Sequence, residues 1–187
     1  MQMDISDKLG RLAESGVCVL EVTSAKYTEL VAKLLASVLR ETDLKAVYVT
    51  VNKSQSFLKN IFNKFKVNLL NLYFIDAVSR DVGEPSAREE DAMFVESPGD
   101  LSGLSIAIEQ VVAQLQKTAQ KPLIFFDSIS TLTIYCSVGS VEKFVHILTS
   151  KIRMQGCRGI FISIPKATDE KLPEMIKQFC DEVIKLE

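Results

Sequence analysis

Short apolar runs alternate with amphipathic stretches along this sequence, and this alternation limits the possible folds more than any other feature. The runs expected to form strands are Val17 to Val22, Ala46 to Val51, Leu70 to Ile75, Leu123 to Phe126, Gly159 to Ile164 and Glu182 to Leu186. Strands that alternate with helices are joined by right-handed crossovers and therefore pair in parallel. The sequence predicts an α/β fold of three layers, in which a mainly parallel sheet lies between two layers of helices.

The stretches between the strands repeat apolar residues at intervals of three and four, as helices with one buried face do. After the first strand, Leu30, Leu34 and Val38 follow this spacing. Further helices are expected over 54–65, 101–115, 141–152 and 170–179, and a short leading helix within residues 1–15. A chain of 187 residues is long enough for one domain with its own core, so we expect a single domain over 1–187.

Bulk properties narrow the possible partners and the compartment. The net charge of −2 gives no electrostatic reason to expect nucleic acid or an anionic membrane as a partner. No apolar run approaches the roughly 20 residues that span a bilayer. The first ten residues lack the pattern of a signal peptide, and the four cysteines form no CxxC pair, so we expect a cytoplasmic protein with buried thiols and no metal.

One long stretch, residues 77–97, shows neither the apolar run of a strand nor the apolar spacing of a helix. It is charged and interrupted by Gly83 and Pro85. Loops of this length in compact domains are usually mobile or functional, and its charges of both signs favour a mobile loop. The apolar residues Met93 to Val95 are the exception, because they could form a short edge strand.

The most informative motif follows the fourth strand, at the sheet edge where ligands of open parallel sheets bind. Residues 122–132 read PLIFFDSISTL, an apolar strand that ends in Asp127. This segment resembles the Walker B motif of the RecA-like ATPases, and in particular of the KaiC-like branch. The order of elements from Gly16 to Glu187 follows the same pattern, so the resemblance implies a RecA-like P-loop NTPase fold. The alternative, that Asp127 is only a cap or turn residue at the end of the strand, remains open.

The phosphate-binding loop of that family, GxxxxGK[ST], is not intact here. The matching residues 21–28 read EVTSAKYT and contain no glycine. Glycine lets the backbone wrap a phosphate in conformations that β-branched residues resist. If Lys26 is aligned with the motif lysine, Tyr27 takes the Ser/Thr position and Thr28 falls one residue late. The pattern indicates a degenerate Walker A motif.

A weak capability remains at this helix start. Thr23 or Ser24 can cap the helix, and its free N–H groups could still attract an anion. The resemblance therefore implies a vestigial nucleotide site at Ser24, Lys26, Thr28 and Asp127, with no cofactor expected and ATP with magnesium as the alternative.

At two further positions of the family's nucleotide site, this sequence departs from the family's pattern. KaiC-like proteins typically carry a Glu pair after the second strand to orient the attacking water, and this sequence has Asn52 and Lys53 there. General-base assistance is worth about 10²–10⁴ in rate. After the fifth strand, Ile164 and Pro165 offer no polar group toward a γ-phosphate. The sequence therefore indicates a pseudo-ATPase without a catalytic residue.

Two functions follow from these observations. The first is a non-hydrolysing RecA/KaiC-like domain that regulates or scaffolds through a protein partner or self-association. The second is an ATP-binding protein or ATPase whose atypical site is completed by a neighbouring subunit. Leu132, Ile134 and Tyr135 could either touch such a neighbour or pack under the sheet. His146, the only histidine, is expected on a helix surface.

Overall fold

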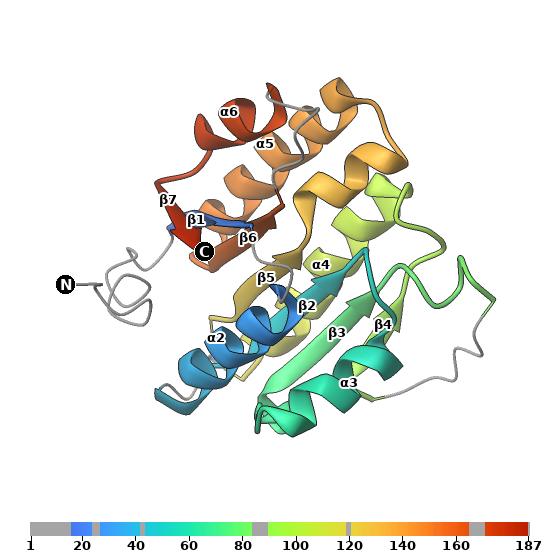
Figure 1. Ribbon diagram of the computed structural model, residues 1–187, viewed down its shortest axis with the longest axis vertical. Helices are drawn as coiled ribbons and strands as arrows, with labels where there is room; N and C mark the ends of the chain where they lie inside the picture. Colours follow the sequence, from blue (N-terminus) through green and yellow to red (C-terminus); the bar gives the residue numbers. More distant parts are fainter. Residues whose placement is uncertain are drawn as a thin grey trace.

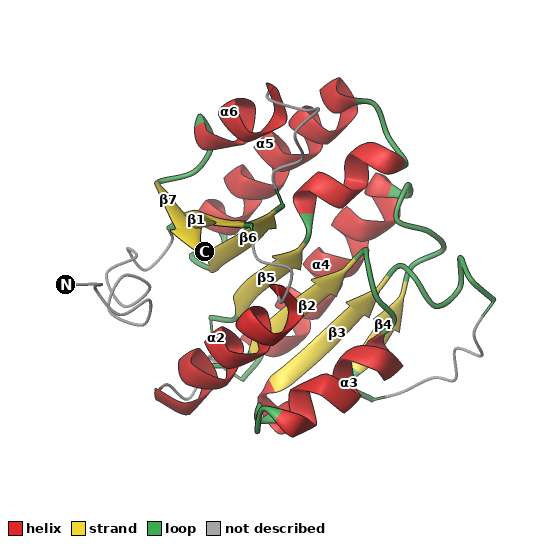
Figure 2. Cartoon of the chain, viewed as in Figure 1, coloured by secondary structure: helices red, strands yellow, loops and turns green. Residues whose placement is uncertain are grey.

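Seven parallel strands form the centre of the protein. The computed structural model describes residues 16–23, 27–41, 44–83, 90–118, 121–164 and 171–186. The strands lie in the order β4-β3-β2-β5-β6-β1-β7, and helices cover both faces of the sheet (Figures 1 and 2). Their bounds are β1 Val17–Val22, β2 Ala46–Thr50, β3 Leu72–Asp76, β4 Ala92–Phe94, β5 Leu123–Asp127, β6 Arg158–Ser163 and β7 Glu182–Leu186.

Two helices cover one face of the sheet and three cover the other. Leucine, valine and phenylalanine side chains of α2 (Tyr27–Glu41) and α3 (Gln55–Lys64) pack on one face. The other face is covered by α4 (Leu101–Gln116), α5 (Val138–Met154) and α6 (Lys171–Lys177). Short 3₁₀ helices, η1 (Leu69–Asn71) and η2 (Ile129–Ile134), precede β3 and follow β5.

Aromatic rings fill the core beside α3. Tyr48 of β2 stacks on Phe125 of β5, with ring centroids 5.3 Å apart, and meets the edge of Phe62 of α3 at 5.2 Å. All three side chains are fully buried. Aromatic pairs at these distances add to the stabilisation that comes from apolar burial alone. Tyr48 and Phe125 lie two residues before the carboxyl ends of the paired strands β2 and β5, next to the site described below.

The predicted α/β fold of three layers is confirmed, and every strand expected from the sequence is present. Among the strands, the largest difference lies at β3, which was expected to begin at Leu70. It begins at Leu72 because the side chain of Asn68 accepts a hydrogen bond from the Leu70 N–H (3.2 Å) and caps η1.

The long stretch 77–97 is partly regular. Ala92–Phe94 forms the edge strand β4, in register with Phe74 to Asp76, so the expected short strand is confirmed within a residue. Residues 84–89 and the leading helix expected within 1–15 lie outside the described residues. The mobility of the loop stays a prediction. In the described part of the chain, no helix is long and apolar enough to cross a membrane.

Candidate functional site

Three polar side chains line up at the carboxyl end of the sheet. Thr50 of β2 is in register with Asp76 of β3 on one side and with Asp127 of β5 on the other. All three are buried. They share the face covered by α2 and α3, because residues two apart along a strand point the same way and Tyr48, Phe74 and Phe125 lie in that core.

The Asp127 carboxyl group is buried with one of its oxygens unsatisfied. Its side chain is 1% exposed, and the Tyr48 hydroxyl donates to Oδ2 at 2.5 Å. Oδ1 has no hydrogen-bond partner among the described residues. Burial raises the pKa of Asp127 to about 6, while the Tyr48 hydrogen bond and the charge of Lys53 hold it from rising further. A carboxyl group in this state is a candidate for ligand binding.

A second cluster lies beside Asp127 and joins α2 to the loop after β2. The Tyr27 hydroxyl accepts hydrogen bonds from Asn52 Nδ2 (2.5 Å) and Lys53 Nζ (2.6 Å). The same ammonium group lies 4.4 Å from the centroid of the Tyr27 ring, a cation–π distance. Burial lowers the pKa of Lys53 and the nearby Asp127 opposes this, while burial and Asp127 both raise the pKa of Tyr27.

Thr50 holds this loop in place. Its hydroxyl donates to the Lys53 carbonyl (2.6 Å) and accepts from the Lys53 N–H at 3.3 Å. The backbone of Lys53 is thus fixed to the end of β2, and its side chain turns toward Tyr27. In the family pattern, a Ser or Thr hydroxyl that binds magnesium stands at the place of Tyr27, and a carboxylate that orients the attacking water stands at the place of Lys53. In this chain the two side chains are in direct contact.

Asp76, by contrast, is a fully bonded carboxylate. Its Oδ1 accepts from the N–H groups of Val78 (2.7 Å) and Ser79 (2.9 Å), and its Oδ2 from the Gln55 N–H and the Ser79 hydroxyl, both at 2.7 Å. Gln55 is the first residue of α3, so Asp76 binds the start of that helix. Its role is to hold the loops after β2 and β3 together.

Glu21 lies on the opposite face of the sheet, because it alternates with the residues of β1 that face α2. It is 6% exposed and forms ion pairs with Lys177 (3.3 Å) and Lys185 (3.8 Å). Glu21 is the first of the residues 21–28 that match the family's phosphate-binding loop, where its charge would oppose a phosphate. The structure directs it to α6 and β7 instead.

The structure places two of the four sequence-predicted site residues. Asp127 ends β5, and Thr28 lies half-buried in the first turn of α2. Ser24 and Lys26 lie outside the described residues. Sequence reasoning missed Tyr48, although a tyrosine in an otherwise apolar buried strand, two residues before its end, was a usable signal. The described residues contain no group of three or more acidic, His or Cys side chains that could hold a metal ion.

The residues after β5 were expected either to touch a neighbouring subunit or to pack under the sheet, and their exposure differs. Leu132 is fully buried, whereas Ile134 and Tyr135 are 65% and 47% exposed. Leu132 therefore packs against the sheet, and the other two side chains face solvent. His146 is exposed on α5, with its ring 4.9 Å from that of Phe179, which confirms the expected helix-surface position.

Comparison with known proteins identifies the family. Residues 16–186 match the family described as Family of unknown function (DUF7504). The chain belongs to this family. The match covers all seven strands, so the DUF7504 region of the chain includes the strand ends that carry Asp76 and Asp127. No curated protein matches the sequence.

Two solved structures share the fold of this DUF7504 chain. One is the uncharacterized protein PH0321 from Pyrococcus horikoshii in complex with an unknown peptide; its TM-score is 0.77 at 11% identity, over 98% of this chain and 82% of that one. The other is the KaiC-like protein PH0186 from Pyrococcus horikoshii OT3, with a TM-score of 0.66 at 14% identity, over 96% and 75% of the two chains. At these identities the likeness concerns the fold, which is KaiC-like.

Proposed function

We propose that this chain is a non-hydrolysing RecA/KaiC-like domain that regulates or scaffolds through contacts with proteins. The observation that carries the proposal is the contact between Tyr27 and Lys53. In the family pattern, a hydroxyl for magnesium and a carboxylate for water stand at these two places. Here a phenol and an ammonium group bind each other in the same space.

The described residues do not fit a magnesium ion. Magnesium takes oxygen ligands and is bound through one or two carboxylates. Among the described residues, Asp127 is the carboxyl group beside this cluster, and the Lys53 ammonium next to it would repel a divalent cation. We therefore derive no hydrolysis step at this site.

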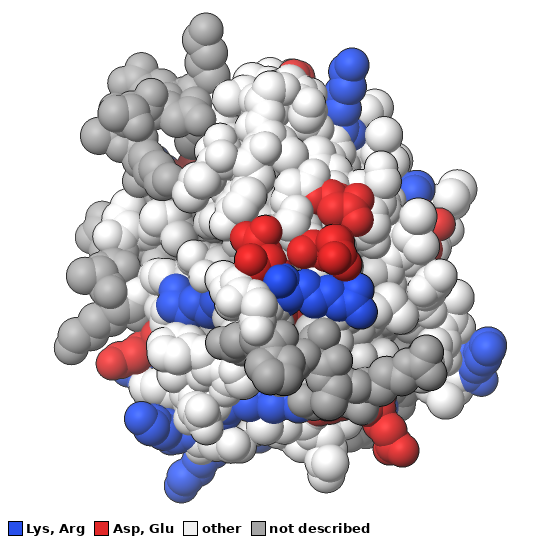
Figure 3. All heavy atoms as spheres, turned by 90° about the vertical axis from the view of Figure 1, so that its right-hand side faces the viewer, with Lys and Arg blue, Asp and Glu red and all other residues white. Residues whose placement is uncertain are grey.

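Two observations support protein contacts as the role. PH0321, which has the same fold, was solved with a peptide. In the described part of the face that carries β4, acidic and basic side chains lie together and form no extended basic surface (Figure 3). Nucleic-acid partners usually require such a surface. A cytoplasmic location fits this role and stays a prediction.

Titration calorimetry with ATP and magnesium tests the proposal. We expect no heat of binding at nucleotide concentrations up to about 1 mM, which corresponds to a binding free energy weaker than about −4 kcal/mol. A dissociation constant in the micromolar range or below would contradict the proposal. A Lys53→Met variant, titrated in parallel, separates a lysine that blocks the site from one that binds phosphate, because only the second loses affinity.

One observation favours the second function, nucleotide binding at a site completed by a neighbouring subunit. Asp127 Oδ1 is buried and has no hydrogen-bond partner in the part of the chain that the structure describes, whereas buried polar atoms normally have a partner. A ligand or a neighbouring chain could supply it. Mass measurement in solution with and without ATP tests this function, which requires a nucleotide-dependent change in assembly.

A further inference from the structure

The edge of the sheet has a notch at the beginning of β3. Pairing between β3 and β4 starts at Phe74, whose N–H donates to the Asp91 carbonyl at 2.8 Å. Leu72 and Tyr73 precede this point, so no described strand lies beside them on that side. The backbone of Leu72 points the same way as that of Phe74 because alternate residues share a direction. Its carbonyl therefore faces the notch, while its N–H is used by the Leu69 carbonyl.

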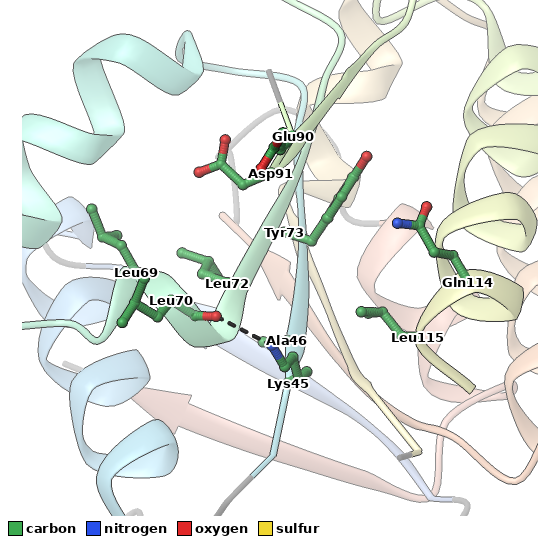
Figure 4. Close-up of a pocket in the computed structure, with 10 residues that line it drawn as sticks. All are labelled: Lys45, Ala46, Leu69, Leu70, Leu72, Tyr73, Glu90, Asp91, Gln114 and Leu115. Atoms are coloured by element: carbon green, nitrogen blue, oxygen red, sulfur yellow. Dashed lines mark hydrogen bonds between the residues drawn. The ribbon is translucent and has the colours of Figure 1, made fainter. Parts of the chain in front are cut away.

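A cavity of about 480 Å³ occupies this notch. Figure 4 shows the leucines of η1 and of the start of β3 on one side of β3, and Tyr73 with Gln114 and Leu115 of α4 on the other, with the acidic residues near the start of β4. The cavity is lined by Lys45, Ala46, Leu69, Leu70, Leu72, Tyr73, Glu90, Asp91, Gln114 and Leu115. It lies at the amino ends of β2 and β3, at the opposite end of these strands from Asp127.

The charges around the cavity are unequal. Lys45 donates to the Leu70 carbonyl (3.4 Å), and Asp91 is paired with Lys59 at 3.0 Å. Glu90 is exposed and forms no ion pair with the described residues. Of these three side chains, Lys45 is half-buried and turned onto a backbone carbonyl, and Asp91 is paired. Glu90 is therefore the exposed charge of the lining that forms no ion pair with the described residues, and the Leu72 carbonyl that faces the notch can accept a hydrogen bond.

The apolar side chains of the cavity are also exposed to solvent. Leu70 is 87% exposed, the most exposed of the large apolar side chains in the described part of the chain. It stands at the wall of the cavity next to Leu69 and Leu72. Exposed apolar side chains beside an unpaired strand edge are typical of surfaces that bind an added strand.

We propose that this notch binds an extended peptide segment of a partner protein, with a lysine or arginine between apolar residues. The peptide lies beside Leu72 as a short added strand and donates a backbone N–H to its carbonyl. One apolar side chain packs on Leu70, and the basic side chain pairs with Glu90. This inference rests on the proposed function, because it names the kind of partner and the surface that receives it.

Selection from a random dodecapeptide library on the immobilised protein tests the proposal. We expect enriched peptides with a basic residue flanked by apolar ones. Binding of an enriched peptide, measured by calorimetry, should weaken about tenfold in Glu90→Gln, the loss typical of one charge-assisted hydrogen bond, and severalfold in Leu70→Ser. Both side chains are exposed, so both variants should fold.

Glu29→Gln is the matched control, because Glu29 is an exposed glutamate on α2 and does not line the cavity. It should leave peptide affinity unchanged. Enrichment of acidic peptides, or no enrichment, would overturn the inference, as would equal affinity for the protein and for Glu90→Gln. These outcomes leave the proposed function standing if ATP does not bind. Micromolar ATP binding would contradict the proposed function, whichever peptides are selected.

Discussion

Asp76 and Asp127 end neighbouring strands on either side of Thr50, and both are buried, yet their surroundings differ. Asp76 accepts four hydrogen bonds from the protein, whereas Asp127 accepts one and leaves Oδ1 without a described partner. Burial at the ligand-binding edge of a sheet therefore does not by itself distinguish a structural aspartate from a functional one. The degree of hydrogen bonding does.

The difference predicts opposite effects of the same substitution. Asp76→Asn replaces one accepting oxygen by an amide NH₂ group, which then faces backbone donors at the start of α3 or in the loop after β3. We expect the free energy of unfolding to fall by about 2–4 kcal/mol, since buried donors lose their acceptor. Urea denaturation at pH 7 measures this. Unchanged stability would mean that the four hydrogen bonds do not hold the two loops.

Asp127→Asn should instead raise the free energy of unfolding at pH 7. The folded protein holds the Asp127 proton up to about pH 6, whereas an unfolded aspartate loses it near its ordinary pKa of 3.8. The contribution of Asp127 to stability is therefore largest below pH 4 and declines as the pH rises from about 4 to about 6. The substitution should gain about 1–3 kcal/mol above this window, because an asparagine needs no charge there.

The measurement is the difference in urea stability between the protein and Asp127→Asn at pH 4.5 and at pH 7. This difference should grow with pH, and Asp76→Asn provides the matched comparison at the neighbouring strand. If Asp127→Asn were as destabilising as Asp76→Asn, Asp127 would be a structural residue like its neighbour.

The smallest expected effect concerns Lys53. Lys53→Met removes the positive charge that lowers the pKa of Asp127, so this pKa should rise above about 6 while stability changes by less than about 1 kcal/mol. Titration of carboxyl ¹³C signals follows Asp127 directly. Lys64→Met, an exposed lysine at the end of α3, is the control and should leave the titration unchanged.

The sequence predicted the fold better than the site, and the reason is physical. Apolar periodicity is a local property, so β1 and β7 were expected with the bounds that the structure has. The state of Asp127 depends on Tyr48, which lies 79 residues earlier and meets it only through the pairing of β2 with β5. Asn68, which shortened β3, was a local signal that apolar periodicity does not include.

The sequence also indicated that Tyr27 and Lys53 depart from the family pattern, but it could not show that they bind each other. That contact joins the first turn of α2 to the loop after β2 and depends on the hydroxyl of Thr50, which fixes the loop. Two departures that look independent along the chain are one arrangement in space.

The position of β1 has a consequence for how the chain matures. Its two neighbours, β6 and β7, lie far from it along the sequence, since the register pairs Val17 with Gly159 and Cys18 with Glu182. β1 therefore remains without these partners until β6 and β7 have been synthesised. Closing such long loops is slow. Until then, the apolar residues of β1 cannot be covered by the two strands that lie beside them in the folded protein.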